Sequence, residues 1–234
     1  MSTRHADAHA ALWPSHGLTV LDGDRTPLDL DELFRESNDA RGGANAGESN
    51  DARGSANGRG GAPKVLEIGF GMGDTLAAMA AADPARDYLG IEVHTPGIGN
   101  LLAEIQDHRL SNVRVALGDA MQLVHRLAPG SLDAVHIFFP DPWPKARHHK
   151  RRLVQPANIA LLRDRLRPGG LLHCATDWPG YAEAMAATLD ADPGLEFVDR
   201  ERAGRPETKF ERRGVGAGRP ITDLRYRRRT ANGS

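Results

Sequence analysis

The sequence predicts an α/β fold with a doubly wound, mostly parallel sheet of seven strands. From residue 64 onward, short apolar runs alternate with segments of helical periodicity, as in parallel sheets whose crossover connections are helices. Glycines follow the first apolar run, at 69–73, which is typical of a strand that turns tightly into a helix. A carboxylate stands near the end of each of the first three predicted strands. These observations together favour an open sheet with a ligand site at one edge.

The predicted elements follow one another at short spacing. Strands are expected at 64–68, 88–92, 112–117, 134–139, 171–175, 195–199 and 222–228. Helices are expected at 74–82, 96–110, 120–127, 155–166 and 181–189. Asp74 or Thr75 is expected to cap the first helix, and Pro168-Gly169-Gly170 to end the fourth. Leu224 and Tyr226 alternate with arginines, which suits a last strand near a sheet edge.

The chain divides into three parts. Residues 1–35 are an N-terminal segment with modest amphipathic stretches. Residues 36–62 contain a tandem duplication, E-S-N-D-A-R-G-G-A-N-A-G followed by E-S-N-D-A-R-G-S-A-N-G-R, in which nine of twelve positions are identical. Because the repeats carry no large apolar residue, burial cannot offset their ordering entropy, and we expect a disordered insertion rich in Gly, Asn and Ser. Residues 63–234 are the expected folded domain.

The composition fits one soluble domain with some extra length. The chain has 234 residues, of which 40% are hydrophobic and 26% charged, and a formal net charge of −1. Cys174 is the single cysteine, which excludes an internal disulfide and favours a reducing, cytoplasmic setting. No apolar run is long enough to span a membrane, and the N-terminus lacks a signal-peptide core. We therefore expect no membrane association.

One stretch concentrates chemical groups at the end of a predicted strand. It runs from 138 to 152 and reads F-F-P-D-P-W-P-K-A-R-H-H-K-R-R. Three prolines in five residues enclose Asp141 and Trp143, so these two side chains are expected on a stiff, extended loop. Five Lys/Arg and two His follow at 145–152. The carboxyl ends of parallel strands bind ligands, so the stretch predicts a reaction centre beside a polyanion.

Three carboxylates at successive strand ends indicate a cationic ligand. Glu67 precedes the glycines by two residues and would oppose a pyrophosphate, and Asp74 stands where a dinucleotide fingerprint has its third glycine. Glu92 is placed to accept both hydroxyls of a ribose, and Asp119 to accept a hydrogen bond from an adenine amino group. S-adenosylmethionine, with its positive sulfonium and amino groups, fits this set. Helix capping is the alternative for each carboxylate, and it is weaker for three equivalent positions than for one.

Five motifs carry a family resemblance. They are V-L-E-I-G-F-G-M-G-D at 65–74, G-I-E-V-H at 90–94, the proline-rich stretch at 138–152, A-T-D-W at 175–178 and R-P-x-T-K-F-E at 205–211. Together they resemble the bacterial tRNA (guanine-N7)-methyltransferase family, and the resemblance covers about 63–229. It implies a Rossmann-like, class I methyltransferase domain dependent on S-adenosylmethionine. It also implies methyl transfer to N7 of guanine 46 in the tRNA variable loop, which forms 7-methylguanosine.

The resemblance implies roles for individual residues, and the glycine loop adds Gly69, Gly71 and Gly73 as close neighbours of the cofactor. Cofactor-binding positions are matched by Glu67, Glu92, Asp119 and Asp141, the last of which also matches the catalytic position. Substrate-contact positions are matched by Lys145, Asp177, Thr208, Lys209, Phe210 and Glu211. The RNA-interacting segment is matched by Arg147, His148, His149, Lys150, Arg151 and Arg152.

The implied chemistry agrees with these residue types. Guanine N7 has a free lone pair and no proton to lose, so the reaction needs alignment and charge stabilisation more than a strong base. We hypothesise that Asp141 orients the guanine or favours the developing charge, with Asp177 as a second recognition carboxylate. Capping of a helix is the open alternative for Asp177. Trp143 either stacks on a base or packs against the cofactor loop.

Several alternatives stay open at the level of the sequence. The basic run at 145–152 is expected to contact phosphates of tRNA rather than to be only solvated surface. No metal is expected, because His148 and His149 have no further ligands at metal-binding spacing. The alternative functions are methylation of another substrate and a non-catalytic RNA-binding module, with an NAD enzyme a distant third. Both a monomer and a homodimer are compatible with the sequence.

Overall fold

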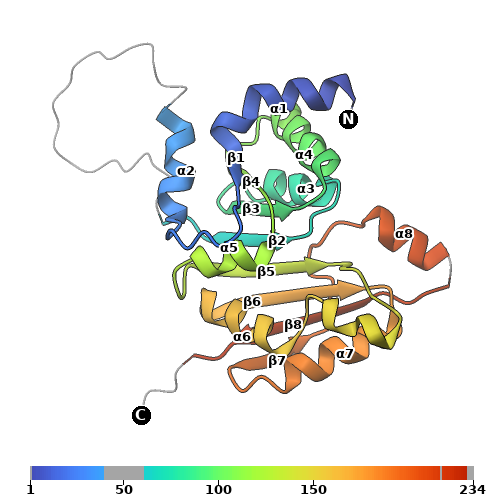
Figure 1. Ribbon diagram of the computed structural model, residues 1–234. Helices are drawn as coiled ribbons and strands as arrows, with labels where there is room; N and C mark the ends of the chain where they lie inside the picture. The colour runs from blue at the N-terminus through green and yellow to red at the C-terminus, as the bar shows by residue number, and fades with distance from the viewer. Residues whose placement is uncertain (1, 40–60, 217, 231–234) are drawn as a thin grey trace.

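The computed structural model of the protein describes residues 2–39, 61–216 and 218–230 (Figure 1). The strands are β1 (Gly17–Thr19), β2 (Lys64–Ile68), β3 (Asp87–Glu92), β4 (Val113–Leu117), β5 (Leu132–Phe138), β6 (Leu166–Thr176), β7 (Leu195–Asp199) and β8 (Thr222–Arg228). The helices are α1 (Thr3–His16), α2 (Leu30–Asp39), α3 (Asp74–Ala82), α4 (Thr95–His108), α5 (Ala120–Arg126), the 3-10 helix η1 (Ala146–Arg151), α6 (Pro156–Arg165), α7 (Pro179–Asp190) and α8 (Lys209–Gly216).

The strands form one doubly wound sheet, which confirms the predicted fold class. Their order is β1-β4-β3-β2-β5-β6-β8-β7. The pairs from β1 through β6 are parallel, and β8 is antiparallel to both of its neighbours, β6 and β7. From the central β2, the chain builds toward β3 and β4 on one side and toward β5 on the other. This reversal of direction opens a crevice at the carboxyl ends of the strands, where ligands bind in such sheets.

Two apolar layers hold helices to the two faces of the sheet. Successive side chains of a strand point to opposite faces, so Val135 and Ile137 of β5 join the layer that also contains Ile159 of α6. Val65 of β2 and Ala134 of β5 join the other layer, beneath α3 and α4. Figure 1 shows α5, α6 and α7 on one side of the sheet and α1, α3 and α4 on the other. The layers fix the strand ends that build the site.

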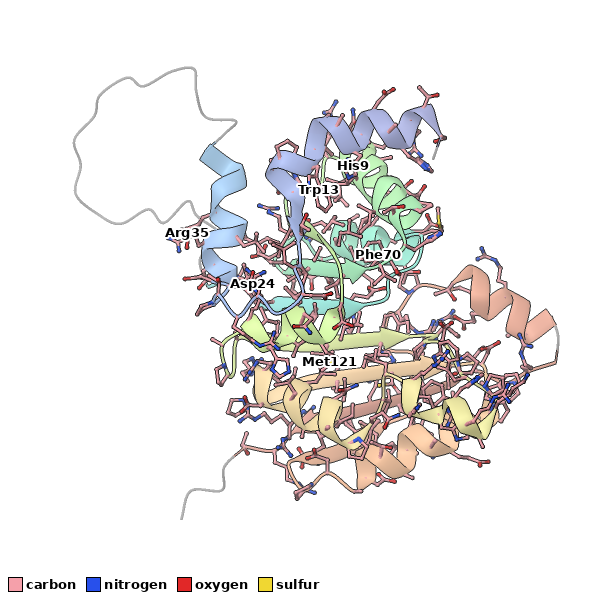
Figure 2. The ribbon with its side chains drawn as sticks, in the orientation of Figure 1. His9, Trp13, Asp24, Arg35, Phe70 and Met121 are labelled. Carbon is pink, nitrogen blue, oxygen red and sulfur yellow. The ribbon has the colours of Figure 1, made fainter. Side chains whose placement is uncertain are left out.

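The sheet has eight strands, where the sequence predicted seven. The extra strand, β1, pairs in parallel with the outer side of β4, with Gly17 opposite Val115. A three-residue strand has no periodicity of its own to predict, and it forms because β4 offers an open edge. The preceding α1 packs on α4, and its His9 and Trp13 rings stack with centroids 4.9 Å apart (Figure 2). The N-terminal segment is thus part of the folded domain.

The start of α3 differs from the prediction. Its N-cap is Gly73, in the left-handed conformation with φ 83°, and neither Asp74 nor Thr75 occupies the cap position. Asp74 instead accepts a hydrogen bond from the Asn100 amide at 3.0 Å. A Cβ added at Gly73 would lie 2.7 Å from the Cβ of Leu101. Glycine is therefore required here by conformation and by space, and α4 can pack against the turn.

The proline-glycine sequence after α6 does not interrupt the sheet. Helix α6 ends at Arg165, and β6 begins at once, with Leu166 opposite Leu132 of β5. The predicted stop at 168–170 lies inside this strand, where the register shifts by a bulge. A bulge accommodates a missing N–H donor and a glycine with positive φ. The last strand, β8, lies next to the edge, and β7 forms the edge itself.

The predicted repeat segment falls mostly outside the described residues. Residues 40–60 are not described, and the expectation of disorder there stays a prediction. The first four residues of the predicted segment, 36–39, instead form the last turn of α2. On the far side of the gap, the Gly61 amide donates to the Asp31 carboxylate of α2 at 3.0 Å. The two sides of the segment therefore meet at the same helix.

Candidate cofactor and active site

A cavity of about 720 Å³ lies at the carboxyl ends of the central strands. Its volume is in the range of small-molecule sites. All seven residues predicted to bind the cofactor line it, namely Glu67, Gly69, Gly71, Gly73, Glu92, Asp119 and Asp141. Figure 2 shows Phe70, which also lines the cavity, in the segment that follows β2. The fold thus brings these predicted positions, which are spread over 75 residues of sequence, around one space.

The glycine turn depends on a glycine that the motif does not contain. Gly69, Gly71 and Gly73 all have positive φ, and the turn packs against the first turn of α4. A Cβ added at Gly97 of α4 would lie 1.9 Å from the carbonyl oxygen of Gly71. A side chain at Gly97 would displace the glycine turn at 69–73. In the sequence, Gly97 is only one residue of the helix predicted at 96–110, and nothing there indicates that a glycine is needed at this position.

Glu67 is a buried carboxyl group on the floor of the cavity. Its residue is 3% exposed, and its Oε2 atom has no hydrogen-bond partner among the described residues. Burial raises its pKa to about 8, and the charge of Arg205 acts in the opposite direction. A buried polar atom without a partner is costly unless a ligand supplies one. This carboxyl group therefore fits a ligand that brings a cation or an N–H donor.

Backbone hydrogen bonds fix the other two strand-end carboxylates. Glu92 accepts from the Gly71 amide at 2.9 Å through Oε2 and from the Val93 amide at 2.7 Å through Oε1. Asp119 accepts from the Gln122 amide at 2.9 Å through Oδ1 and caps α5. Capping is therefore the observed role of Asp119, and its second oxygen remains for a ligand. Each carboxylate is oriented before any ligand binds, which reduces the entropy lost on binding.

The proline-rich loop is tighter than the sequence predicted. Two of its residues lie in the left-handed region, Phe139 with φ 51° and Trp143 with φ 43°. Such values are uncommon for aromatic residues and gather at functional sites. The exposed carboxylate of Asp141 lies between them and lines the cavity. The loop therefore holds Asp141 at the mouth of the same space that contains Glu67.

Arg152 differs from the predicted RNA contact. Its residue is 8% exposed, its Nε donates to the carbonyl oxygen of Pro142 at 2.9 Å, and its guanidinium lies 4.6 Å from the Tyr181 ring centre. The side chain is used to hold the proline-rich loop against α7. Burial and these partners do not support a phosphate contact for Arg152, and its predicted contact with RNA stays a prediction.

The rest of the basic run forms η1 at the rim of the cavity. Lys145, Arg147, His149, Lys150 and Arg151 are exposed and His148 is partly exposed. The Arg151 guanidinium lies 4.9 Å from the Trp143 ring centre, and His148 meets the same ring edge-on at 5.8 Å. Trp143 therefore packs against η1, and this contact joins the basic segment to the loop that carries Asp141.

The predicted substrate-contact residues do not all line the cavity. Thr208 lines the cavity, and its Oγ1 accepts from the Glu211 amide at 3.0 Å. Glu211 is 7% exposed and pairs with Arg205 at 2.7 Å, so its carboxylate is part of the scaffold. Asp177 pairs with Arg219 at 2.8 Å and lies outside the cavity lining. The cap of α7 is Trp178, which removes the capping alternative for Asp177.

The structure does not describe two of the predicted side chains of this motif, and it adds two cavity residues that were not predicted. The backbones of Lys209 and Phe210 begin α8, and their side chains lie outside the described part of the structure. Glu207 and Arg212 line the cavity and face each other, with the Glu207 Oε2 3.8 Å from the Arg212 Nη1. Sequence reasoning missed this pair, and only its position beside the T-K-F-E motif pointed to it.

The chain has the fold of the class I methyltransferases. The solved 16S rRNA methyltransferase KamB has the same fold, with a TM-score of 0.53 and 18% sequence identity over 72% of this chain and 88% of that chain. A family model described as "Putative methyltransferase" matches residues 61–224. The matched region spans the cavity and every strand that builds it.

Closer relatives identify the family. A tRNA (guanine-N(7)-)-methyltransferase of Alkalilimnicola ehrlichii is 49% identical over 93% of this chain and 84% of its own length. The protein of the same name in Halorhodospira halophila is 50% identical over 93% of this chain and 86% of its own length. The chain belongs to the tRNA (guanine-N7)-methyltransferase family.

The described residues contain neither a metal cluster nor a membrane-spanning helix. Within residues 2–39, 61–216 and 218–230, no group of three or more His, Cys, Asp or Glu side chains is arranged to hold a metal ion. In the same part of the chain, no helix combines the length and the apolar character that crossing a membrane requires.

Proposed function

We propose that this protein transfers a methyl group from S-adenosylmethionine to N7 of guanine in tRNA, at position 46 of the variable loop. The main support is that Glu67 and Asp141 line the same cavity, with the basic helix η1 at its rim. Glu67 is buried, and its Oε2 atom has no hydrogen-bond partner among the described residues. The relatives of about 50% identity, named for this activity, support the same conclusion. The fold alone does not specify the substrate.

The cavity residues suit S-adenosylmethionine as the cofactor. Glu67 offers a carboxyl group for a cationic group, and Glu92 and Asp119 offer oriented oxygens for ribose hydroxyls and an adenine amino group. The large apolar side chains of Met72 and Val93 are 37% and 70% exposed at the same place, and they offer a surface for a planar ring. When bound, the cofactor supplies a methyl group on a positively charged sulfur, which is open to attack by a lone pair.

The chain's own residues orient the guanine and stabilise charge. Asp141 lies between the two left-handed residues of its loop and lines the cavity, and in this proposal its carboxylate accepts from the N–H groups of guanine. The same negative charge favours the positive charge that develops on the purine as N7 becomes bonded to carbon. No proton has to leave N7, so Asp141 acts without general-base chemistry. Fixed carboxylate geometry then contributes through alignment.

The basic helix η1 supplies the RNA-binding charge in this proposal. Its exposed side chains lie beside the Asp141 loop, where the phosphates that flank an extruded guanine would pass. Phosphate contacts fix position and carry no base information. Specificity for guanine therefore rests on the cavity residues. The buried thiol of Cys174 agrees with a reducing, cytoplasmic setting, which we propose for the protein.

Methyl transfer to two unmodified tRNA transcripts tests the proposal. One transcript carries guanine at the variable-loop position and the other carries adenine there. We expect labelled methyl on the guanine transcript only, and a loss of at least about a hundredfold in rate for Asp141→Ala, in line with loss of an oriented charged group. Equal labelling of both transcripts, or none with cofactor binding intact, would contradict the assigned substrate.

A further inference from the structure

Arg205 is a charged side chain buried under the wall of the cavity. Its side chain is 1% exposed, and its guanidinium makes three hydrogen bonds to two carboxylates. It donates to Asp223 from Nε at 3.1 Å and from Nη2 at 2.9 Å, and to Glu211 from Nη1 at 2.7 Å. Paired, two-point contacts of this kind fix the direction of an arginine as well as its position.

The two carboxylates belong to different parts of the fold. Asp223 is on β8, and its Oδ1 is also 2.7 Å from Nε2 of His173 on β6, so it is anchored in the sheet. Glu211 is in the first turn of α8, and its amide donates to Oγ1 of Thr208. Figure 1 shows α8 beyond the carboxyl end of β5, apart from the other helices. Arg205 therefore ties an outlying helix to the sheet.

The same guanidinium also contacts the base of the proline-rich loop. It lies 5.5 Å from the ring centre of Phe138 and 5.2 Å from that of Phe139. Both rings line the cavity, and Phe139 is the left-handed residue that comes two positions before Asp141. One side chain thus touches the start of the proline-rich loop that carries Asp141 and, through Glu211, the first turn of α8.

We propose that Arg205 is a positioning residue that sets the Thr208 end of α8 and the Asp141 loop in a fixed relation on the two sides of the cavity. It does not line the cavity itself, so it acts through Thr208 and Phe139. Without Arg205, Asp223 still contacts the buried His173 at 2.7 Å, whereas among the described residues the Glu211 carboxylate keeps only the exposed Arg202 at 2.8 Å, so loss of Arg205 is expected to release α8 first. The inference deepens the proposed function, because the geometry that it protects is that of methyl transfer.

Hydrogen exchange, cofactor binding and methyl transfer in matched variants test this role. In Arg205→Met we expect amide exchange at 209–212 to speed up at least about tenfold. We expect kcat for tRNA methylation at saturating S-adenosylmethionine to fall at least about tenfold. Cofactor affinity measured by calorimetry should fall less than kcat does, because the variant keeps every residue that lines the cavity and loses only the charge that opposes the raised pKa of Glu67. Arg205→Lys keeps the positive charge but donates from a single nitrogen, so its kcat should lie between those of Arg205→Met and the wild type.

Arg114 offers a matched control. It is 1% exposed, lies 4.8 Å from the Phe34 ring centre, and donates to the carbonyl oxygens of Leu33 and Phe34 far from the cavity. Arg114→Met should lower the melting temperature and leave kcat and exchange at 209–212 unchanged. Equal effects of the two variants on kcat would overturn the proposal, as would unchanged exchange in Arg205→Met.

A milder variant tests the same role if Arg205→Met does not fold. Glu211→Gln keeps a hydrogen-bond acceptor for Arg205 and removes one charge, and it should show the same faster exchange at 209–212 to a smaller degree. Unchanged exchange in this variant would also count against the role of Arg205. If the wild-type protein does not methylate tRNA, the proposed function fails, while the exchange experiment still decides whether Arg205 holds α8.

Discussion

At the scale of single residues, Glu67 links ligand binding to pH. Burial, opposed by Arg205, raises its pKa to about 8, so the carboxyl group is mostly protonated at neutral pH in the free protein. Its neighbour across the strands, His136, has a pKa lowered to about 3 by burial and by His173, and therefore adds no positive charge. A cationic ligand favours the ionised carboxylate, so its binding releases a proton.

Proton release makes the affinity for S-adenosylmethionine depend on pH. Between pH 6 and 8 the affinity for S-adenosylmethionine should rise with pH, by at most about tenfold per pH unit. Calorimetry in buffers of different ionisation enthalpy measures both the affinity and the released proton. Glu67→Gln should bind more weakly and with a flat pH profile. A wild-type affinity independent of pH would contradict the protonated carboxyl group.

The sign of the effect on folding is opposite. The folded pKa of Glu67 is higher than the ordinary value of 4.5, so the folded protein binds the proton more tightly than the unfolded chain does. The free energy of unfolding of the ligand-free protein should therefore fall as pH rises from about 5 to about 8, by at most about 1.4 kcal/mol per pH unit from this group. Urea unfolding of the wild type and of Glu67→Gln at several pH values isolates the contribution, and parallel curves for the two proteins would disprove it.

At the scale of elements, the turn before α3 is set by Gly73. Alanine at this position meets both a left-handed backbone and the Cβ of Leu101 at 2.7 Å. Gly73→Ala should lower the free energy of unfolding by about 2–4 kcal/mol and weaken cofactor binding. Gly23→Ala is the control, because Gly23 has φ 76° with nothing within 4 Å of an added Cβ, so that only the backbone cost of about 1 kcal/mol remains. Equal losses in the two variants would rule out the packing contribution.

The exposed basic side chains of η1 are expected to neutralise phosphates of tRNA, and the salt dependence of binding tests this. Removing Lys150 or Arg147 should lower the slope of log K against log salt for tRNA binding by about 0.7–0.9 for each phosphate that the variant no longer neutralises. Arg35, an exposed residue on α2, is the control, and Arg35→Ala should leave the slope unchanged. Binding measured by filter retention over a range of salt concentrations decides this. An unchanged slope in Lys150→Ala and Arg147→Ala would exclude η1 as the phosphate-binding element.

At the scale of the whole molecule, the folded domain spans both sides of the tandem repeat. Helix α2 and the strand that follows the repeat are joined by the ion pair of Lys64 with Asp31 at 2.8 Å, and Phe34 is buried in the main core. Replacing residues 40–60 with a short Gly-Ser linker should therefore change the free energy of unfolding by less than about 1 kcal/mol, because loop-closure entropy varies slowly with length. Urea unfolding and cofactor calorimetry measure it, and loss of cofactor binding would show that the repeat belongs to the site.

Much of the fold and of the candidate site followed from the sequence. The alternation of apolar runs with helical segments determined a doubly wound sheet, because buried parallel strands and crossover helices each impose their own period. The positions of Glu67, Glu92 and Asp119 at strand ends were enough to place them together, since parallel strands end at one edge. Local pattern and topology therefore carried the prediction of this cavity.

The tertiary structure decided which members of a motif face the cavity. Arg152 lies in a basic run and Glu211 in a motif predicted to contact substrate, yet both are buried in scaffold contacts. Arg205, Glu207 and Gly97 gained their places only through partners from other elements. The physical reason is that spacing along a chain fixes which residues are near in sequence, whereas burial, charge pairing and close packing depend on what the rest of the fold brings to each side chain.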